Sequence, residues 1–165
     1  MIVVSDTSPI LSLIYIQQLH LLPLLFKQVV VPVGVERELM NSRLSEEQKN
    51  IFKAQIHISV KAPSDQSAVK NIISNDLHLP EAEAIILALE LHADFILIDE
   101  NIGRAIAANK GLTIVGVLGI LLKAKQQNLI PAIKPLMDIL VAETGFWISK
   151  NLYKQLLQLS NENES

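Results

Sequence analysis

The stretch IVVSDTSP, residues 2–9, joins an apolar β-branched run to a helix start. β-branched residues favour strands. The hydroxyls of Thr7 and Ser8 suit the N-cap of a helix, and Pro9 suits its first turn. The stretch therefore predicts a short buried strand, an acidic residue (Asp6) at its carboxyl end, and a helix that begins directly afterwards.

The same alternation of strand-like and helix-like segments continues along the chain. Three further apolar runs predict strands at residues 29–31, 95–98 and 113–117, and residues 56–60 are a weaker candidate. Short strands that are apolar on both faces are typical of a parallel sheet covered on both sides. We therefore predict an α/β fold, a three-layer αβα sandwich around a central, mostly parallel sheet of four to five strands.

Length and composition restrict the organisation of the protein. A chain of 165 residues, 50% of them hydrophobic, suits one domain with a substantial core. We predict a single domain over residues 1–159, with a C-terminal helical part at 118–159 and a polar tail at 160–165. The absence of cysteine excludes disulfide scaffolds, cysteine zinc sites and thiol nucleophiles.

Charge and hydropathy narrow the class of protein further. The net charge of −3 is untypical of proteins that bind nucleic acid through a basic surface. No apolar run reaches the roughly 18 residues of a membrane helix. Asp6 interrupts the first apolar run, which argues against a signal peptide. We therefore expect a cytoplasmic protein with no membrane association.

Four acidic residues are expected to meet at one edge of the sheet. Asp6 and Asp99 each follow a predicted strand, Glu38 lies on the helix after the second strand, and Glu83 lies early in a helix that begins at Pro80. Ligands of open parallel sheets bind beyond the carboxyl ends of the strands. Like charges about 6 Å apart repel by about 3 kcal/mol at an effective dielectric of about 20. Such a cluster usually needs a cation, and carboxylates without His or Cys favour Mg2+ or Mn2+.

These segments resemble the PIN domain family. The resemblance rests on VSDTSP at 4–9, the stretch from Pro32 to Glu38-Leu39, PEAEAI at 80–85, and LID at 97–99. It is strongest to the subset resembling VapC-type toxins, in which the third acid sits in a Glu-Ala-Glu-Ala helix. It covers the chain to about Val117, and the helices predicted beyond that point resemble the C-terminal part of the same subset.

The resemblance implies a metal-dependent endoribonuclease that hydrolyses RNA phosphodiester bonds with Mg2+ or Mn2+. Carried over residue by residue, Asp6, Glu38, Glu83 and Asp99 are the catalytic acids and metal ligands, and Ser8 is the hydroxyl residue that supports the site. Many members of the family are toxins that an antitoxin protein neutralises, and many are homodimers. The resemblance therefore also implies an antitoxin partner and a homodimer.

Each of these acids also has a plainer interpretation. Asp6 could cap the helix that follows it, and Asp99 could cap the helix that begins near Ile102. Glu36 and Glu81 are rivals for the roles assigned above to their neighbours on the same helices. An acid in the first turn of a helix is favoured by the helix dipole whether or not it binds a metal.

Two other classes of function remain as alternatives. One is a PIN-like binding or assembly module without nuclease activity. The other is a phosphatase-like or response-regulator-like domain, in which a strand-end Asp accepts phosphate, although the sequence contains no motif that supports it. RNA cleavage with manganese, repeated after Asp6→Asn, distinguishes a nuclease from both.

Apolar surface predicts how the chain packs and associates. The segments at 10–16, 19–26 and 119–122 are apolar on more than one side, which predicts a homodimer and an apolar groove for a partner. Ser149 is a suitable N-cap for a last helix with apolar residues at helical spacing. This helix should therefore pack on the domain, whereas the tail at 161–165 should be dispensable.

Overall fold

The structure, a computed structural model, describes residues 1–163 and contains one parallel sheet of five strands. The strand order is β3-β2-β1-β4-β5, and every neighbouring pair is parallel. The strands are β1 (Ile2–Ser5), β2 (Gln28–Pro32), β3 (Ile58–Lys61), β4 (Phe95–Leu97) and β5 (Ile114–Val115). The predicted α/β fold is thus confirmed, and the weak strand candidate at 56–60 corresponds to β3.

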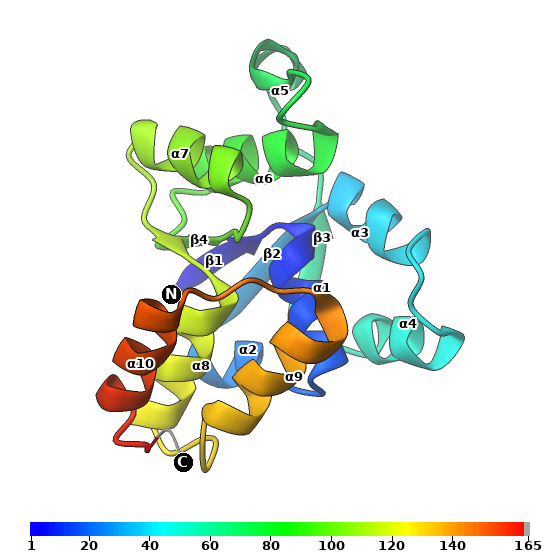
Figure 1. Cartoon of the computed structure of the whole chain (residues 1–165). Helices are drawn as coiled ribbons and strands as arrows, with labels where there is room; N and C mark the ends of the chain where they lie inside the picture. The colour runs from blue at the N-terminus through cyan, green and yellow to red at the C-terminus, as the bar shows by residue number, and fades with distance from the viewer. Residues whose placement is uncertain (164–165) are drawn as a thin grey trace.

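Helices cover both faces of the sheet, as Figure 1 shows. Those in the N-terminal half are α1 (Thr7–Tyr15), α2 (Leu21–Leu25), α3 (Val33–Met40), α4 (Glu46–Lys53) and α5 (Gln66–Ile72). The others are α6 (Leu79–Glu90), α7 (Asn101–Asn109), α8 (Val117–Gln126), α9 (Lys134–Thr144) and α10 (Lys150–Leu159). None of these helices is long and apolar enough to cross a membrane.

Alternate side chains of each strand enter two separate apolar clusters. In β1, Val3 belongs to a cluster that includes residues of α1, α2, α8, α9 and α10, whereas Val4 belongs to a cluster that includes residues of α5, α6 and α7. Leu97 and Ile96 of β4 divide between the clusters in the same way. This alternation follows from the two-residue period of a strand. The two clusters make the three layers of the predicted αβα sandwich.

The strand order places a crevice beside β1. From β1 the chain continues to β2 and β3 on one side of the sheet, and β4 and β5 lie on the other side. The direction of winding therefore changes between β1 and β4. In open parallel sheets this change is where ligands bind, outside the carboxyl ends of the strands. Asp6 follows β1 directly, and Asp99 follows β4 after one intervening residue.

One strand is shorter than the sequence predicts. Residues 113–117 were expected to be extended, but β5 contains only Ile114 and Val115, and α8 begins at Val117. The Val117 N–H donates to both carboxylate oxygens of Asp99, at 3.2 and 3.1 Å. This long-range contact satisfies a free N–H at the start of α8, which favours the early helix start.

The last helix packs on the domain, as its apolar spacing predicts. Leu156 and Leu157 are buried in the same cluster as α8 and α9. Ser149 is the N-cap, and its hydroxyl accepts from the Leu152 N–H at 3.1 Å.

The part of the tail that the structure describes contacts the domain, which argues against the expectation that it is dispensable. The Glu162 carboxylate accepts hydrogen bonds of 2.8–3.1 Å from the backbone N–H groups of Ile133 and Lys134, at the start of α9. Ser160 is also buried. The tail therefore caps a helix that begins almost thirty residues earlier in the chain. Local sequence does not predict this contact. Residues 164 and 165 of the predicted tail lie outside the described part.

We expect Glu162→Ala to lower the free energy of unfolding by about 1–3 kcal/mol, because two partly buried N–H groups lose a charged acceptor. Burial raises the pKa of Glu162, but the Ile133 and Lys134 N–H groups lower it more, so the pKa lies below its ordinary value of 4.5. The stabilisation is therefore present above pH 4.5 and is lost as the pH falls through the lower, folded-state pKa. Thermal melting at pH 7 and at acidic pH measures both effects. The exposed Glu143→Ala is the control, and equal melting temperatures for the two variants at pH 7 would contradict the capping role.

Candidate functional site

Asp6 is a buried carboxylate at the carboxyl end of β1. Its side chain is 2% exposed, and Oδ1 has no hydrogen-bond partner. Although Asp6 occupies the N-cap position of α1, its side chain makes no capping hydrogen bond. The pKa of Asp6 is raised from 3.8 to about 7, chiefly by burial and in addition by the charges of Glu81, Glu38 and Glu100, while the Thr7 N–H opposes the shift. The capping interpretation therefore does not explain why a carboxylate is buried here.

Glu81 and Glu38 are the two acids whose charges do most to raise the pKa of Asp6. Glu81 lies in the first turn of α6, and its Oε2 is buried without a partner. Glu38 lies on α3, which leaves the carboxyl end of β2 directly. Burial raises the pKa of Glu38 and Glu81 raises it further, whereas Thr7 and His78 lower it. Helices α3 and α6 thus bring two carboxylates towards the end of β1.

Glu83, the third predicted acid, faces elsewhere. It is buried, and its Oε2 accepts from the Gly34 N–H in the first turn of α3 at 3.2 Å. A Cβ atom at Gly34 would lie 2.9 Å from Glu83 Oε1, so the glycine allows this close approach. Glu83 therefore joins α6 to the start of α3. Among the two glutamates of this segment, Glu81 is the one whose charge raises the pKa values of Asp6 and Glu38, which favours the rival interpretation of the Glu-Ala-Glu-Ala segment.

Helical geometry explains the difference between the two glutamates of this segment. Successive residues of an α-helix are about 100° apart, so residues two apart point to nearly opposite sides. Glu81 and Glu83 therefore leave α6 in different directions. Which of them faces Asp6 depends on how α6 is turned against α3, and these two helices are in contact.

Asp99 lies beyond β4 and interacts with α8. The pKa of Asp99 is raised to about 6, because the effect of burial exceeds the lowering by the Val117 N–H and by Arg104. A Cβ atom at Gly116 would clash with Asp99 Oδ1. Glu100, and not Asp99, caps α7, because its carboxylate accepts from the N–H groups of Ile102 and Gly103 at 3.0 and 2.7 Å. The alternative that Asp99 caps the helix near Ile102 is therefore wrong, and Asp99 instead accepts from the Val117 N–H at the start of α8.

Ser8, the predicted supporting hydroxyl, is exposed in the first turn of α1 and borders a cavity of about 350 Å³ next to Asp99. We call this cavity the edge cavity. Its walls come from α1, from the residues after β4 and from the end of α9 with the connection to α10. The lining residues are Ser8, Leu11, Ser12, Tyr15, Asp99, Glu100, Thr144, Gly145 and Phe146.

The acids of this edge fit a hard divalent cation in chemistry. Their donors are carboxylate oxygens, the ligands that Mg2+ and Mn2+ prefer. Two of these oxygens, Asp6 Oδ1 and Glu81 Oε2, are buried without partners, and a cation would satisfy both. Among residues 1–163, however, no three acidic or histidine side chains lie close enough together to hold one ion. Binding would therefore require side-chain rotation, which the exposed Glu38 is free to make.

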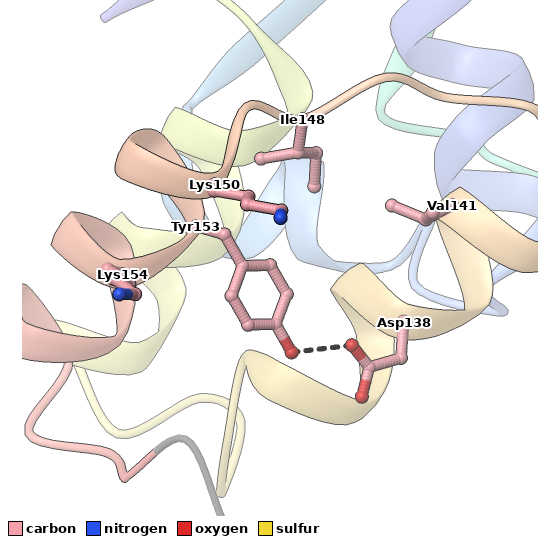
Figure 2. Close-up of a pocket in the computed structure, with 6 residues that line it drawn as sticks. All are labelled: Asp138, Val141, Ile148, Lys150, Tyr153 and Lys154. Carbon is pink, nitrogen blue, oxygen red and sulfur yellow. Dashed lines mark hydrogen bonds between the residues drawn. The ribbon is translucent and has the colours of Figure 1, made fainter.

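A second cavity, of about 330 Å³, lies between α9 and α10 and contains none of the predicted acids (Figure 2). The Tyr153 hydroxyl donates to Asp138 Oδ1 at 2.6 Å, and Lys134 Nζ donates to Asp138 Oδ2 at 2.9 Å. Val141 and Ile148 supply apolar walls. These contacts join the last two helices, and we assign this cavity no part in the site at the sheet edge.

The sheet order, the three layers and the acidic carboxyl edge together define an α/β domain of the PIN type. Residues 2–162 match the family DUF3368, described as a PIN domain, and the chain therefore belongs to the PIN domain family. A solved structure with a similar fold is a PilT N-terminus domain protein from the hyperthermophilic archaeon Sulfolobus solfataricus P2. It is 17% identical, with a TM-score of 0.53 over 75% of this chain and 93% of the other. No curated protein matches the sequence.

Proposed function

We propose that the protein is a metal-dependent endoribonuclease of the VapC type, the toxin of a toxin–antitoxin pair that acts in the cytoplasm. The observation that carries the proposal is Asp6, a buried carboxylate with an unpartnered oxygen that faces Glu38 and Glu81 at the carboxyl edge of the sheet. Burial of like charges is costly, and a protein retains it chiefly where the charges perform chemistry.

In this proposal Asp6, Glu38 and Glu81 hold Mg2+ or Mn2+, and Asp99 completes the acidic edge. A bound divalent ion supplies charge for the phosphodiester and activates water for its hydrolysis. Glu83 acts indirectly, because its bond to the Gly34 N–H positions α3 and therefore Glu38. Ser8 lies beside Asp99 at the mouth of the edge cavity, where its hydroxyl can contact the substrate.

A PIN-like binding or assembly module without nuclease activity is the second candidate. The observation in its favour is that residues 1–163 contain no acidic trio already arranged around a metal position. The acidic net charge of −3 also gives RNA no general attraction to the surface. Such a module would bind its partner equally well with and without divalent cations.

The proposal is tested by incubating single-stranded RNA with the protein in Mn2+, in Mg2+ and in a chelator. We expect internal cleavage with either ion, none with the chelator, and a large loss of cleavage for Asp6→Asn. The matched control is Asp76→Asn, since Asp76 is exposed and is not among the groups that shift the pKa of Asp6, Glu38 or Asp99. Equal cleavage by the parent and Asp6→Asn would indicate that a contaminant cleaves the RNA. Absence of cleavage by the parent would favour the binding module.

The partners expected from the sequence remain predictions. A homodimer would have twice the 18.3 kDa mass of the chain in light scattering. A toxin would slow the growth of a bacterial host when expressed, and Asp6→Asn would restore growth. An antitoxin would then be recognised as a protein that binds this chain and suppresses RNA cleavage.

A further inference from the structure

The edge cavity is continuous with the acidic edge, since Asp99 and Glu100 form part of its wall. Its volume of about 350 Å³ falls in the lower part of the range of roughly 300–1,000 Å³ that is usual for small-molecule pockets. It is therefore large enough for one planar ring system but not for a folded element of a partner. A group bound there would lie directly beside any phosphodiester held at the acids.

The wall of the edge cavity suits a neutral, planar and polar group. Tyr15 and Phe146 offer aromatic rings, Ser8 and Ser12 offer hydroxyls, and the residues that line it among those described include no Lys, Arg or His. A phosphate in this cavity would meet the carboxylates without a compensating cation. A nucleobase carries no charge and has an aromatic face and polar edges, so it matches both kinds of wall.

The aromatic wall is held in place before anything binds. Gly145 adopts a left-handed conformation with φ of 72°, which ends α9 and turns the chain towards α10. The Phe146 N–H donates to the Leu140 carbonyl at 3.2 Å, and the Phe146 ring packs partly on the core. Figure 1 shows this connection crossing from α9 to α10 over the sheet side of the helices. Tyr15, in contrast, is 40% exposed at the end of α1 and is available to a ligand.

We propose that the edge cavity binds one unstacked base of a single-stranded RNA, next to the phosphodiester that reaches Asp6 and Asp99. This inference rests on the proposed nuclease function and adds a subsite to it. Single-stranded RNA is recognised by splaying out bases and stacking them on aromatic side chains. The subsite also explains how an acidic protein could select RNA: affinity would come from stacking and hydroxyl contacts and not from a basic surface.

The test uses a single-stranded RNA oligonucleotide with an abasic residue at each position in turn. Binding of hydrolysis-resistant copies is measured by fluorescence anisotropy in Mn2+, and kcat and KM are measured on cleavable copies. We expect one position at which loss of the base weakens binding roughly tenfold or more. Tyr15→Ala should weaken binding of the intact oligonucleotide by a similar factor. The affinity of this variant should then no longer depend on the abasic residue. Tyr15→Phe should behave as the parent.

Trp147→Ala is the matched control, because Trp147 is an exposed aromatic residue adjacent to Phe146 but does not line the cavity. It should keep the affinity and the base sensitivity of the parent. Phe146→Ala tests the second ring, and its melting temperature distinguishes loss of the subsite from loss of the fold. Base sensitivity that persists in both Tyr15→Ala and Phe146→Ala would overturn the proposal.

The outcomes separate this inference from the proposed function. Cleavage that is insensitive to every abasic position leaves the nuclease intact and overturns the base subsite. Base-sensitive binding without cleavage in Mg2+ or Mn2+ overturns the nuclease and supports the cavity as an RNA-binding site. Absence of RNA binding overturns both the nuclease function and the base subsite. This outcome is expected if the edge cavity instead accepts a side chain of a protein partner.

Discussion

Asp6→Asn should melt at a higher temperature than the parent at pH 8 in the absence of divalent ions. The pKa of Asp6 is raised from 3.8 to about 7 in the folded protein, so ionisation of this acid opposes folding. The destabilisation grows as the pH rises from about 4 to 7 and is constant above that, and Asp99, with its pKa raised to about 6, adds to it. At about 1.4 kcal/mol per pKa unit, the variant should gain on the order of 1–4 kcal/mol at pH 8.

Divalent ions should reduce or remove this difference. A ligand at 100 times its dissociation constant stabilises the folded state by about 2.7 kcal/mol. The parent should gain such a shift in Mn2+, and Asp6→Asn should lose most of it. Loss of about 3 kcal/mol of electrostatic stabilisation should also lower the rate of RNA cleavage by about 100-fold or more.

The measurement is the melting temperature of both proteins at pH 4 and pH 8, with a chelator and across a Mn2+ series. At pH 4 without metal the two melting temperatures should approach each other, because the parent's Asp6 is then protonated. The exposed Asp76→Asn controls for general effects of charge. An equal Mn2+ shift in parent and Asp6→Asn would remove Asp6 from the metal site, and a lower melting temperature for the variant at pH 8 would indicate a structural role.

Glu81→Gln and Glu83→Gln should differ sharply although they lie two residues apart. Glu81→Gln removes a carboxylate that faces Asp6 and Glu38, so cleavage should fall by about 100-fold while stability stays equal or rises. Glu83→Gln keeps an oxygen that can accept from the Gly34 N–H, so most activity and stability should remain.

Glu83→Ala completes the comparison, because it removes the acceptor as well as the charge. The buried Gly34 N–H then lacks its partner, which costs about 1–3 kcal/mol, and the start of α3 should loosen. Cleavage rates at saturating Mn2+ and melting temperatures for the three variants test the assignment. The reverse result, with Glu83→Gln inactive and Glu81→Gln active, would return the catalytic role to Glu83, as the family resemblance implies.

Local sequence was sufficient for most of the fold. The alternation of β-branched runs with capped helices predicted the parallel sheet and its layers, because strands and helices each have a short-range period. Ser149 was identified as an N-cap from its own neighbourhood, and the structure confirms it. The order of strands also places Asp6 and Asp99 at the expected edge, since each acid follows a strand in the chain.

Tertiary packing decided the features that depend on contacts between distant residues. Three such contacts differ from what local sequence suggested: the Glu83 bond to Gly34, the Asp99 bond to Val117, and the Glu162 bonds to the start of α9. In each case an acid satisfies backbone N–H groups of a helix that is 18 to 49 residues away. Sequence determined which residues are acidic and which elements carry them. Only the packing of α6 on α3 decided that Glu81 and not Glu83 faces Asp6, because helix rotation is set by side chains that interlock across the interface and not by the spacing within one helix.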